Sequence, residues 1–293
     1  MTRTPYRGSI WALCLLALAS IPPAAGAPSA GAQTGGGENV DIALVLVTDV
    51  SYSVDENEAR FQREGAITAF RNQEVVKAIE SGALGRIAVS YIDFASAGQE
   101  RILVNWQLVH DKASADAFAD ALARVPRTAG VQTSISSGIA LAARMIETSG
   151  FRATQRVIDV SGDGPNNDGL RVDRLRDETV AKGITINGLP IVTEADKFDV
   201  YYLADLDKYY AGCVIGGQNA FYQIAHGFED LARAIRRKLI LEISDAASRR
   251  NATIIKVAAA SPSSRPAVYE KGCDIGERMR FGGVSDFGRP GAR

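Results

Sequence analysis

Apolar runs rich in β-branched residues alternate along this chain with segments of helical periodicity, and this alternation restricts the possible folds more than any other feature. The apolar runs cover 40–47, 86–94, 101–106, 156–160 and 184–192. Helical spacing of apolar residues runs from Phe118 to Val125, from Ile135 to Ile146 and from Phe228 to Leu239. Strands that alternate with helices are typical of βαβ units. We therefore predict an α/β fold with a doubly wound, mainly parallel sheet and helices on both faces.

One connection departs from this alternation. The runs 86–94 and 101–106 are separated only by a short stretch that begins Ala-Ser-Ala-Gly-Gln. A parallel crossover needs about a dozen residues or more. We predict that these two strands form an antiparallel hairpin at one edge of the sheet.

The N-terminus has the pattern of a cleavable export signal. Arg3 and Arg7 precede an apolar run over 10–19, and small residues follow it as far as Ala32. The run ends at Pro22-Pro23, which makes it too short for a membrane span of about 20 residues. We predict a signal peptide over 1–32 and a secreted or periplasmic mature protein without a transmembrane segment.

The rest of the chain divides by composition. Residues 33–39 form a Gly-rich linker, 40–246 carry the alternating pattern, and 247–293 read as a mostly irregular C-terminal tail. Loss of 1–32 removes two of the 33 basic residues and none of the 34 acidic ones, leaving 31 against 34, a net charge of −3. This balance argues against a nucleic-acid partner.

Two cysteines remain after loss of the signal, which contains Cys14. Cys213 and Cys273 would then form the single possible pair in an oxidising compartment. A disulfide between them is the expectation, and two buried free thiols are the alternative.

Polar loops follow two of the predicted strands and precede one predicted helix. They cover 49–53, 130–134 and 161–167. In an open α/β sheet, ligands bind beyond the carboxyl ends of the strands. Each loop alone could be an ordinary turn or helix cap, but together they offer carboxylate and hydroxyl oxygens, which Mg²⁺ prefers. The combination predicts a metal site at this edge.

The ordered motifs resemble the metal-ion-dependent adhesion site of von Willebrand factor type A (vWA) domains. They are Asp-x-Ser-x-Ser over 49–53, a threonine at 133 and Gly-Asp-Gly at 162–164. The resemblance extends over about 40–245. The stretch 209–217 and the end of the last helix are similar to a bacterial secreted subfamily, DUF1194.

This resemblance implies a ligand set and a mode of binding. Ser51, Ser53 and Thr133 would supply hydroxyl ligands to Mg²⁺ or Mn²⁺, while Asp49 and Asp163 would bind directly or through water. An acidic residue of a protein partner would complete the coordination, with Tyr52 beside it. Rivals exist among nearby residues, namely Asp159 and Asp168 for Asp163 and Thr128 for Thr133.

Two other functions compete with this binding module. Aspartate-based phosphotransferases also place an aspartate after the first strand, but they carry a second acid where this chain has Ser51. We therefore expect no enzyme activity. A structural or assembly domain that binds no metal is the other alternative.

Two further clusters favour structural roles. The basic residues of the last helix, Arg233, Arg236, Arg237 and Lys238, are expected on its solvated face. Tyr209 and Tyr210 are expected to pack in the core, with an exposed recognition surface as the alternative.

Overall fold

The computed structural model describes residues 37–54, 56–193, 201–252 and 268–281. The predicted signal peptide, most of the predicted linker and parts of the predicted tail lie outside these ranges. Within them, no helix is long and apolar enough to cross a membrane.

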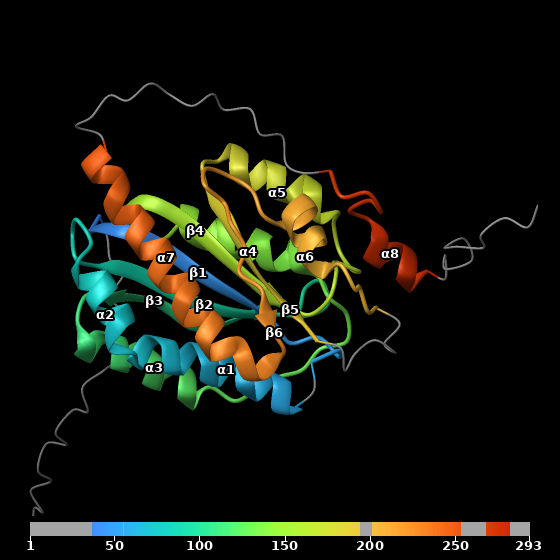
Figure 1. The fold of residues 1–293 in the computed structure, drawn as a ribbon, viewed down its shortest axis with the longest axis horizontal. Coiled ribbons are helices and arrows are strands. Elements are labelled where there is room, and N and C mark those ends of the chain that lie inside the picture. Colours follow the sequence, from blue (N-terminus) through green and yellow to red (C-terminus); the bar gives the residue numbers. More distant parts are fainter. Residues whose placement is uncertain (1–36, 55, 194–200, 253–267, 282–293) are drawn as a thin grey trace, which may run out of the picture. The chain divides into compact units, whose positions relative to one another are not determined.

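A six-stranded sheet forms the centre of the domain, in the order β3-β2-β1-β4-β5-β6 (Figure 1). The strands are β1 (Asn39–Asp49), β2 (Ile87–Phe94), β3 (Arg101–Val109), β4 (Arg152–Gly162), β5 (Thr185–Val192) and β6 (Ala225–His226). All neighbouring strands pair in parallel except β2 and β3. The predicted fold class and the antiparallel edge hairpin are both confirmed.

Helices cover both faces of this sheet. They are α1 (Glu56–Arg71), α2 (Gln73–Glu80), α3 (Lys112–Arg124), α4 (Ile135–Glu147), α5 (Val172–Ala181), α6 (Leu206–Tyr209), η1 (Tyr210–Val214), η2 (Phe228–Asp230), α7 (Leu231–Ala252) and α8 (Ile275–Arg280). Buried residues of α1, α2, α3 and α7 share one core cluster, and those of α4, α5, α6, η1 and α8 share another. Figure 1 shows α7 crossing one face and α4 behind the sheet.

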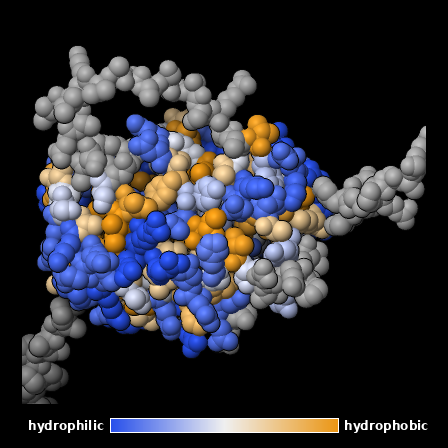
Figure 2. Space-filling view, viewed as in Figure 1, coloured by the Kyte–Doolittle hydropathy of each residue, from blue (hydrophilic) through white to orange (hydrophobic). Residues whose placement is uncertain are grey.

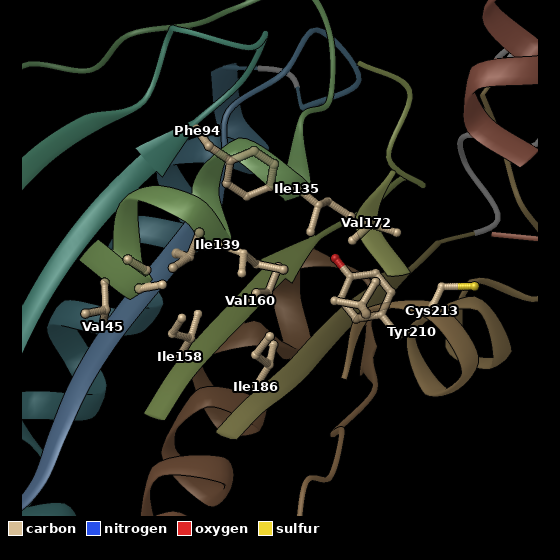
Figure 3. Packing of buried hydrophobic residues seen from close by; sticks show 14 of the residues in the cluster. Val45, Phe94, Ile135, Ile139, Ile158, Val160, Val172, Ile186, Tyr210 and Cys213 are labelled. Atoms are coloured by element: carbon tan, nitrogen blue, oxygen red, sulfur yellow. The ribbon is translucent and has the colours of Figure 1, made fainter. Parts of the chain in front are cut away.

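The central strand β1 belongs to both cores because successive side chains of a strand point to opposite faces. Ile42, Leu44 and Leu46 pack in the first cluster, whereas Val45 and Val47 pack in the second. Figure 3 shows the second cluster, where Tyr210 lies near Val160 of β4 and Ile186 of β5. A strand buried on both faces needs a continuous apolar sequence, which is what 42–47 supplies.

Three features differ from the sequence predictions. The short strand β6 and the helix α8, which lies in the predicted irregular tail, were not predicted. Lys238 is not on the solvated face, since it is 0% exposed. It follows the buried residues Leu231 and Ala234 at spacings of seven and four, so it lies on the inner face of α7.

On the side seen in Figure 2 the surface is mostly hydrophilic, with small hydrophobic groups between polar ones.

Candidate metal site

The three polar loops meet at the carboxyl edge of the central strands. Asp49 is the last residue of β1, and Asp163 directly follows β4. Because β1 and β4 are parallel neighbours, their ends lie side by side. Thr133 precedes α4, and Gly130 N of its loop donates to Val50 O at 2.9 Å. The fold therefore brings together the loops 49–53, 130–134 and 161–167.

The five predicted ligands form one connected cluster. Thr133 Oγ1 donates to Ser51 Oγ at 3.0 Å, and Ser51 Oγ lies 3.2 Å from Ser53 Oγ. Ser53 Oγ donates to Asp163 Oδ1 at 2.9 Å. The backbone N of Ser51 donates to Asp49 Oδ1 at 2.8 Å. The structure thus places all five side chains in one site, while their roles as metal ligands stay predictions.

Asp49 is the most unusual residue of the cluster. It is 0% exposed, and its Oδ2 is buried without a hydrogen-bond partner among the residues that the structure describes. Burial raises the pKa of this carboxyl to about 7, against a partly opposing effect of its hydrogen bonds with Ser51. Within the described part of the chain, no ion pair joins Asp49 to a basic side chain. Burying a carboxylate without a compensating partner costs free energy. A cation bound at this oxygen would compensate its charge.

Tyr210 is a site residue that the sequence analysis did not find. It is fully buried, as predicted, but its hydroxyl has no hydrogen-bond partner among the described residues. A Cβ added at Gly162 would lie 2.9 Å from Asp49 Oδ2 and 3.0 Å from the Tyr210 hydroxyl, so both groups approach the same point. Burial and the nearby Asp49 raise the pKa of Tyr210 well above its ordinary value. It therefore remains a neutral hydroxyl that can donate a hydrogen bond at the site.

Two asparagines that were not predicted either connect the second and third loops. Asn167 Oδ1 accepts from Thr133 N at 2.8 Å, and Asn167 N donates to Thr133 O at 2.8 Å. Asn166 Oδ1 accepts from Ser136 N at 3.0 Å, in the first turn of α4. These bonds fix Thr133 relative to the loop of Asp163. In the sequence, only their position directly after Gly-Asp-Gly-Pro indicated a role at the site.

The rival ligands have other partners. Asp159 Oδ1 lies 2.6 Å from Lys238 Nζ in the interior. Asp168 accepts from Ala97 N at 2.9 Å and forms an ion pair with Arg280. Thr128 is exposed. The structure thus favours Asp163 and Thr133.

The donor set fits a hard divalent cation. It consists of two carboxylates and three hydroxyls, all of them oxygen ligands. Among the described residues, no three or more His, Cys, Asp or Glu side chains group into a metal site, so a cation here would depend on hydroxyls. The first two loops each expose one large apolar side chain, Tyr52 at 81% and Val131 at 64%, and Leu170, three residues after the third loop, is 68% exposed.

The family model described as "Protein of unknown function (DUF1194)" matches residues 39–247, well over half of the chain. The chain belongs to the DUF1194 family. No curated protein matches this DUF1194 chain. The family assignment confirms the DUF1194 resemblance of the sequence.

Solved structures extend the likeness of this DUF1194 chain at the level of fold. Proximal thread matrix protein 1 from the mussel byssus and the pilus adhesin SpaC from Lactobacillus rhamnosus GG each align with a TM-score of 0.50, at 14% and 16% identity. The alignments cover 72% and 73% of this chain but 49% and 30% of those chains. The chain therefore spans half or less of the length of these proteins. A von Willebrand factor type A structure from Catenulispora acidiphila aligns at 16% identity with a TM-score of 0.45, over 72% of this chain and 43% of that one.

Proposed function

We propose that this chain is an exported vWA-like module, periplasmic or secreted, that binds a protein partner at a site for Mg²⁺ or Mn²⁺. The observation that carries the proposal is the buried Asp49 carboxylate at the meeting point of the three polar loops, where its Oδ2 has no hydrogen-bond partner among the described residues. Asp49, Ser51, Ser53, Thr133 and Asp163 would hold the cation. Bound there, the ion supplies a Lewis-acidic centre that favours a carboxylate oxygen from the partner.

The chain's own residues would position that partner. Tyr52 and Val131 lie on the first and second loops, Leu170 follows the third, and all three expose apolar side chains. Apolar contacts around a central polar group are typical of protein interfaces. This surface supports a protein partner with an acidic residue flanked by apolar side chains, in preference to a small free anion.

Export is supported by the Cys213–Cys273 disulfide, which is present as predicted, since disulfides persist in oxidising compartments. The adhesin and matrix protein noted above support a binding module through their shared fold alone. The hydrolase alternative is disfavoured by Ser51, which stands where aspartate-based phosphotransferases carry a second acid.

Thermal unfolding with Mn²⁺ or with EDTA tests the metal site. At a metal concentration 100 times the Kd, binding to the native state adds about 2.7 kcal/mol. For a domain of this size that corresponds to a rise in Tm of roughly 5–10 °C. Asp49→Asn should abolish the shift, because it removes the charge but keeps the shape.

Asp93→Asn is the matched control. Asp93 is also a buried acid at the carboxyl end of a central strand, but its Oδ2 lies 3.3 Å from Arg63 Nη2. This variant should keep the metal-dependent shift whatever its own stability. A wild-type Tm that does not respond to millimolar Mn²⁺ or Mg²⁺ would contradict the metal site. Capture of the same partners with EDTA as with Mg²⁺ would contradict the metal-dependent mode of binding.

A further inference from the structure

The C-terminal segment 268–281 packs against the loop that carries Asp163. An added Cβ at Gly276, in the first turns of α8, would lie 2.1 Å from Asn166 O, so the helix backbone approaches this loop closely. Ile275 and Tyr269 are buried in the core beside α4, α5 and η1. Tyr269 OH and Lys271 Nζ both donate to Asp205 Oδ1, at 3.0 and 2.7 Å. This segment is therefore docked on the domain.

Two side chains of α8 bind the asparagine pair that connects the site loops. Glu277 Oε1 accepts from Asn166 Nδ2 at 2.8 Å. Arg280 Nη1 donates to Asn167 O at 3.2 Å and also pairs with Asp168. Asn167 in turn bonds both the N and the O of Thr133. Hydrogen bonds thus lead from Arg280 through Asn167 to Thr133, and from Glu277 through Asn166 to the first turn of α4, which follows Thr133.

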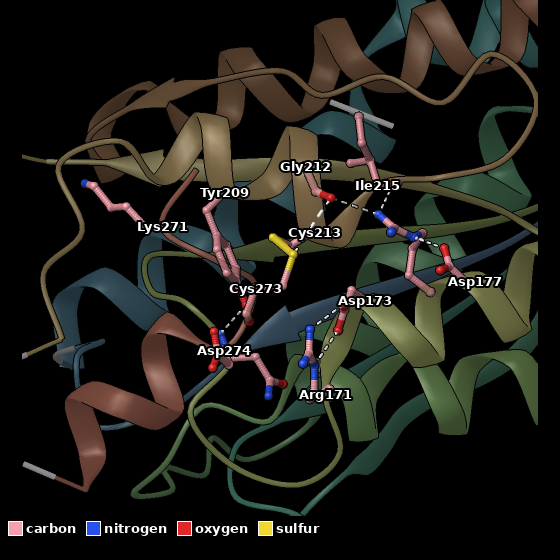
Figure 4. Close-up of a disulfide and its surroundings, with 12 residues drawn as sticks. Arg171, Asp173, Asp177, Tyr209, Gly212, Cys213, Ile215, Lys271, Cys273 and Asp274 are labelled. Carbon is pink, nitrogen blue, oxygen red and sulfur yellow. Dashed lines mark hydrogen bonds and ion pairs between the residues drawn. A yellow bond between two sulfur atoms is a disulfide. The ribbon is translucent and has the colours of Figure 1, made fainter. Parts of the chain in front are cut away.

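The disulfide fastens this segment to the same region. Cys273, just before α8, is bonded to Cys213 of η1 across a sequence separation of 60 (Figure 4). Tyr209 accepts from Asn166 N at 3.1 Å, and its hydroxyl lies 3.5 Å from Cys273 O. The short π-helix η1 begins with Tyr210, whose hydroxyl approaches Asp49. One covalent bond therefore joins the turn of Tyr210 to the segment that contacts Asn166 and Asn167.

We propose that residues 268–281, held by the Cys213–Cys273 disulfide, are a positioning element for the metal site, with Glu277 and Arg280 as positioning residues. They hold the loops of Thr133 and Asp163 in the arrangement that binds the cation. Loss of these contacts lowers metal affinity without unfolding the domain. The inference rests on the proposed metal site and goes beyond it, because it assigns a role to a part of the chain that the matched region 39–247 does not include.

The test compares two substitutions of Glu277 in the otherwise intact chain. Glu277→Ala removes the side-chain acceptor of Asn166 Nδ2 and leaves the backbone acceptors Asp168 O and Leu170 O. Mn²⁺ should then bind about tenfold more weakly by titration calorimetry, the low end of the effect for groups that orient metal ligands. Glu277→Gln keeps an acceptor oxygen and should bind within about twofold of wild type. Amide hydrogen exchange should become faster over 130–136 and 161–171 in the alanine variant alone.

Asp274→Ala is the control on the same helix. Asp274 pairs with Arg278, four residues on, and its loss should change neither Mn²⁺ affinity nor exchange in the site loops. The double variant Cys213→Ser/Cys273→Ser should weaken Mn²⁺ binding at least as much as Glu277→Ala. If it fails to fold, the Glu277 pair still decides the question.

The outcomes separate this inference from the proposed function. Equal Mn²⁺ affinity in wild type and Glu277→Ala would overturn the positioning role and leave the metal site intact. Equal losses in the alanine and glutamine variants would also overturn it, because the hydrogen bond would then not be the cause. A wild-type chain that binds no Mn²⁺ would overturn both.

Discussion

Two groups of buried acids lie along the central sheet, and they differ in whether the protein supplies a cation. In the interior group, Lys238 Nζ lies 2.6 Å from both Asp159 Oδ1 and Glu242 Oε1. Asn187 Nδ2 also donates to Glu242 Oε1 at 2.7 Å. In the site group, Asp49 Oδ1 accepts from the backbone N of Ser51 and Asp163 Oδ1 accepts from the Ser53 hydroxyl, and Asp49 has no basic partner within the described residues.

This difference separates a structural cluster from a binding site. A buried acid is tolerated when a charge and hydrogen bonds compensate it, as in the interior group and in the pair of Asp93 with Arg63. Asp49 accepts from a backbone N and lies beside hydroxyls, but no basic side chain among the described residues compensates it. The comparison therefore explains why Asp49, and not Asp159, is the candidate ligand, although both are buried acids of neighbouring strands.

The strongest test of the comparison is removal of the internal cation. Lys238→Met should lower the free energy of unfolding by about 3–5 kcal/mol, because it leaves two buried acids without their charge partner. Urea unfolding at neutral pH measures this loss. Arg237→Met, at the neighbouring exposed position, should change stability by less than about 0.5 kcal/mol. Similar small effects of both variants would show that the interior group is not held by Lys238.

A second test uses pH. Burial raises the pKa of Glu242 to about 7 from 4.5, Lys238 opposes this shift, and Asp159 adds to it. The folded chain therefore holds a proton that the unfolded chain loses, so the free energy of unfolding falls as pH rises from about 4.5 to about 7.

Glu242→Gln should remove this contribution. Between pH 5 and pH 8, wild type should lose on the order of 2 kcal/mol more stability than the variant. Chemical unfolding of both proteins in EDTA at several pH values measures this difference in stability. The contributions of titrating groups that both proteins share, such as Asp49 and Asp93, cancel in the subtraction. Parallel curves for the two proteins would contradict the assignment.

The same contrast shows what the sequence could predict. Five of the six strands and the three loops were predictable, because apolar runs and the polar residues that end them are local patterns. Asp49, Ser51, Ser53, Thr133 and Asp163 came from these patterns together with the vWA resemblance, and the structure brings them together.

The residues that were missed depend on contacts between distant segments. Lys238 was expected in solvent from its residue type, but the rotation of α7 directs it to Asp159, far away in sequence. Tyr210 was correctly expected in the core, yet only the fold places its hydroxyl near Asp49. The helix α8 is six residues long, too short to predict from periodicity, and tertiary contacts and a disulfide hold it in place.

A third test, at the site itself, has the smallest expected effect on stability. It asks whether the Thr133 hydroxyl binds the metal or only supports the fold. Thr133 is buried, and its hydroxyl donates to Ser51 Oγ. Thr133→Val keeps the volume and removes this hydrogen bond, so the metal-free chain should lose only about 1 kcal/mol of stability. Mn²⁺ affinity should nevertheless fall at least tenfold, since a ligand oxygen is gone, and Thr133→Ser, which keeps the hydroxyl, should retain most of it. Calorimetric titration and urea unfolding of the two variants give both numbers. If Thr133→Val bound Mn²⁺ as well as Thr133→Ser, the hydroxyl would support the fold and would not be a metal ligand. The site group would then resemble the interior group, in which polar contacts are structural.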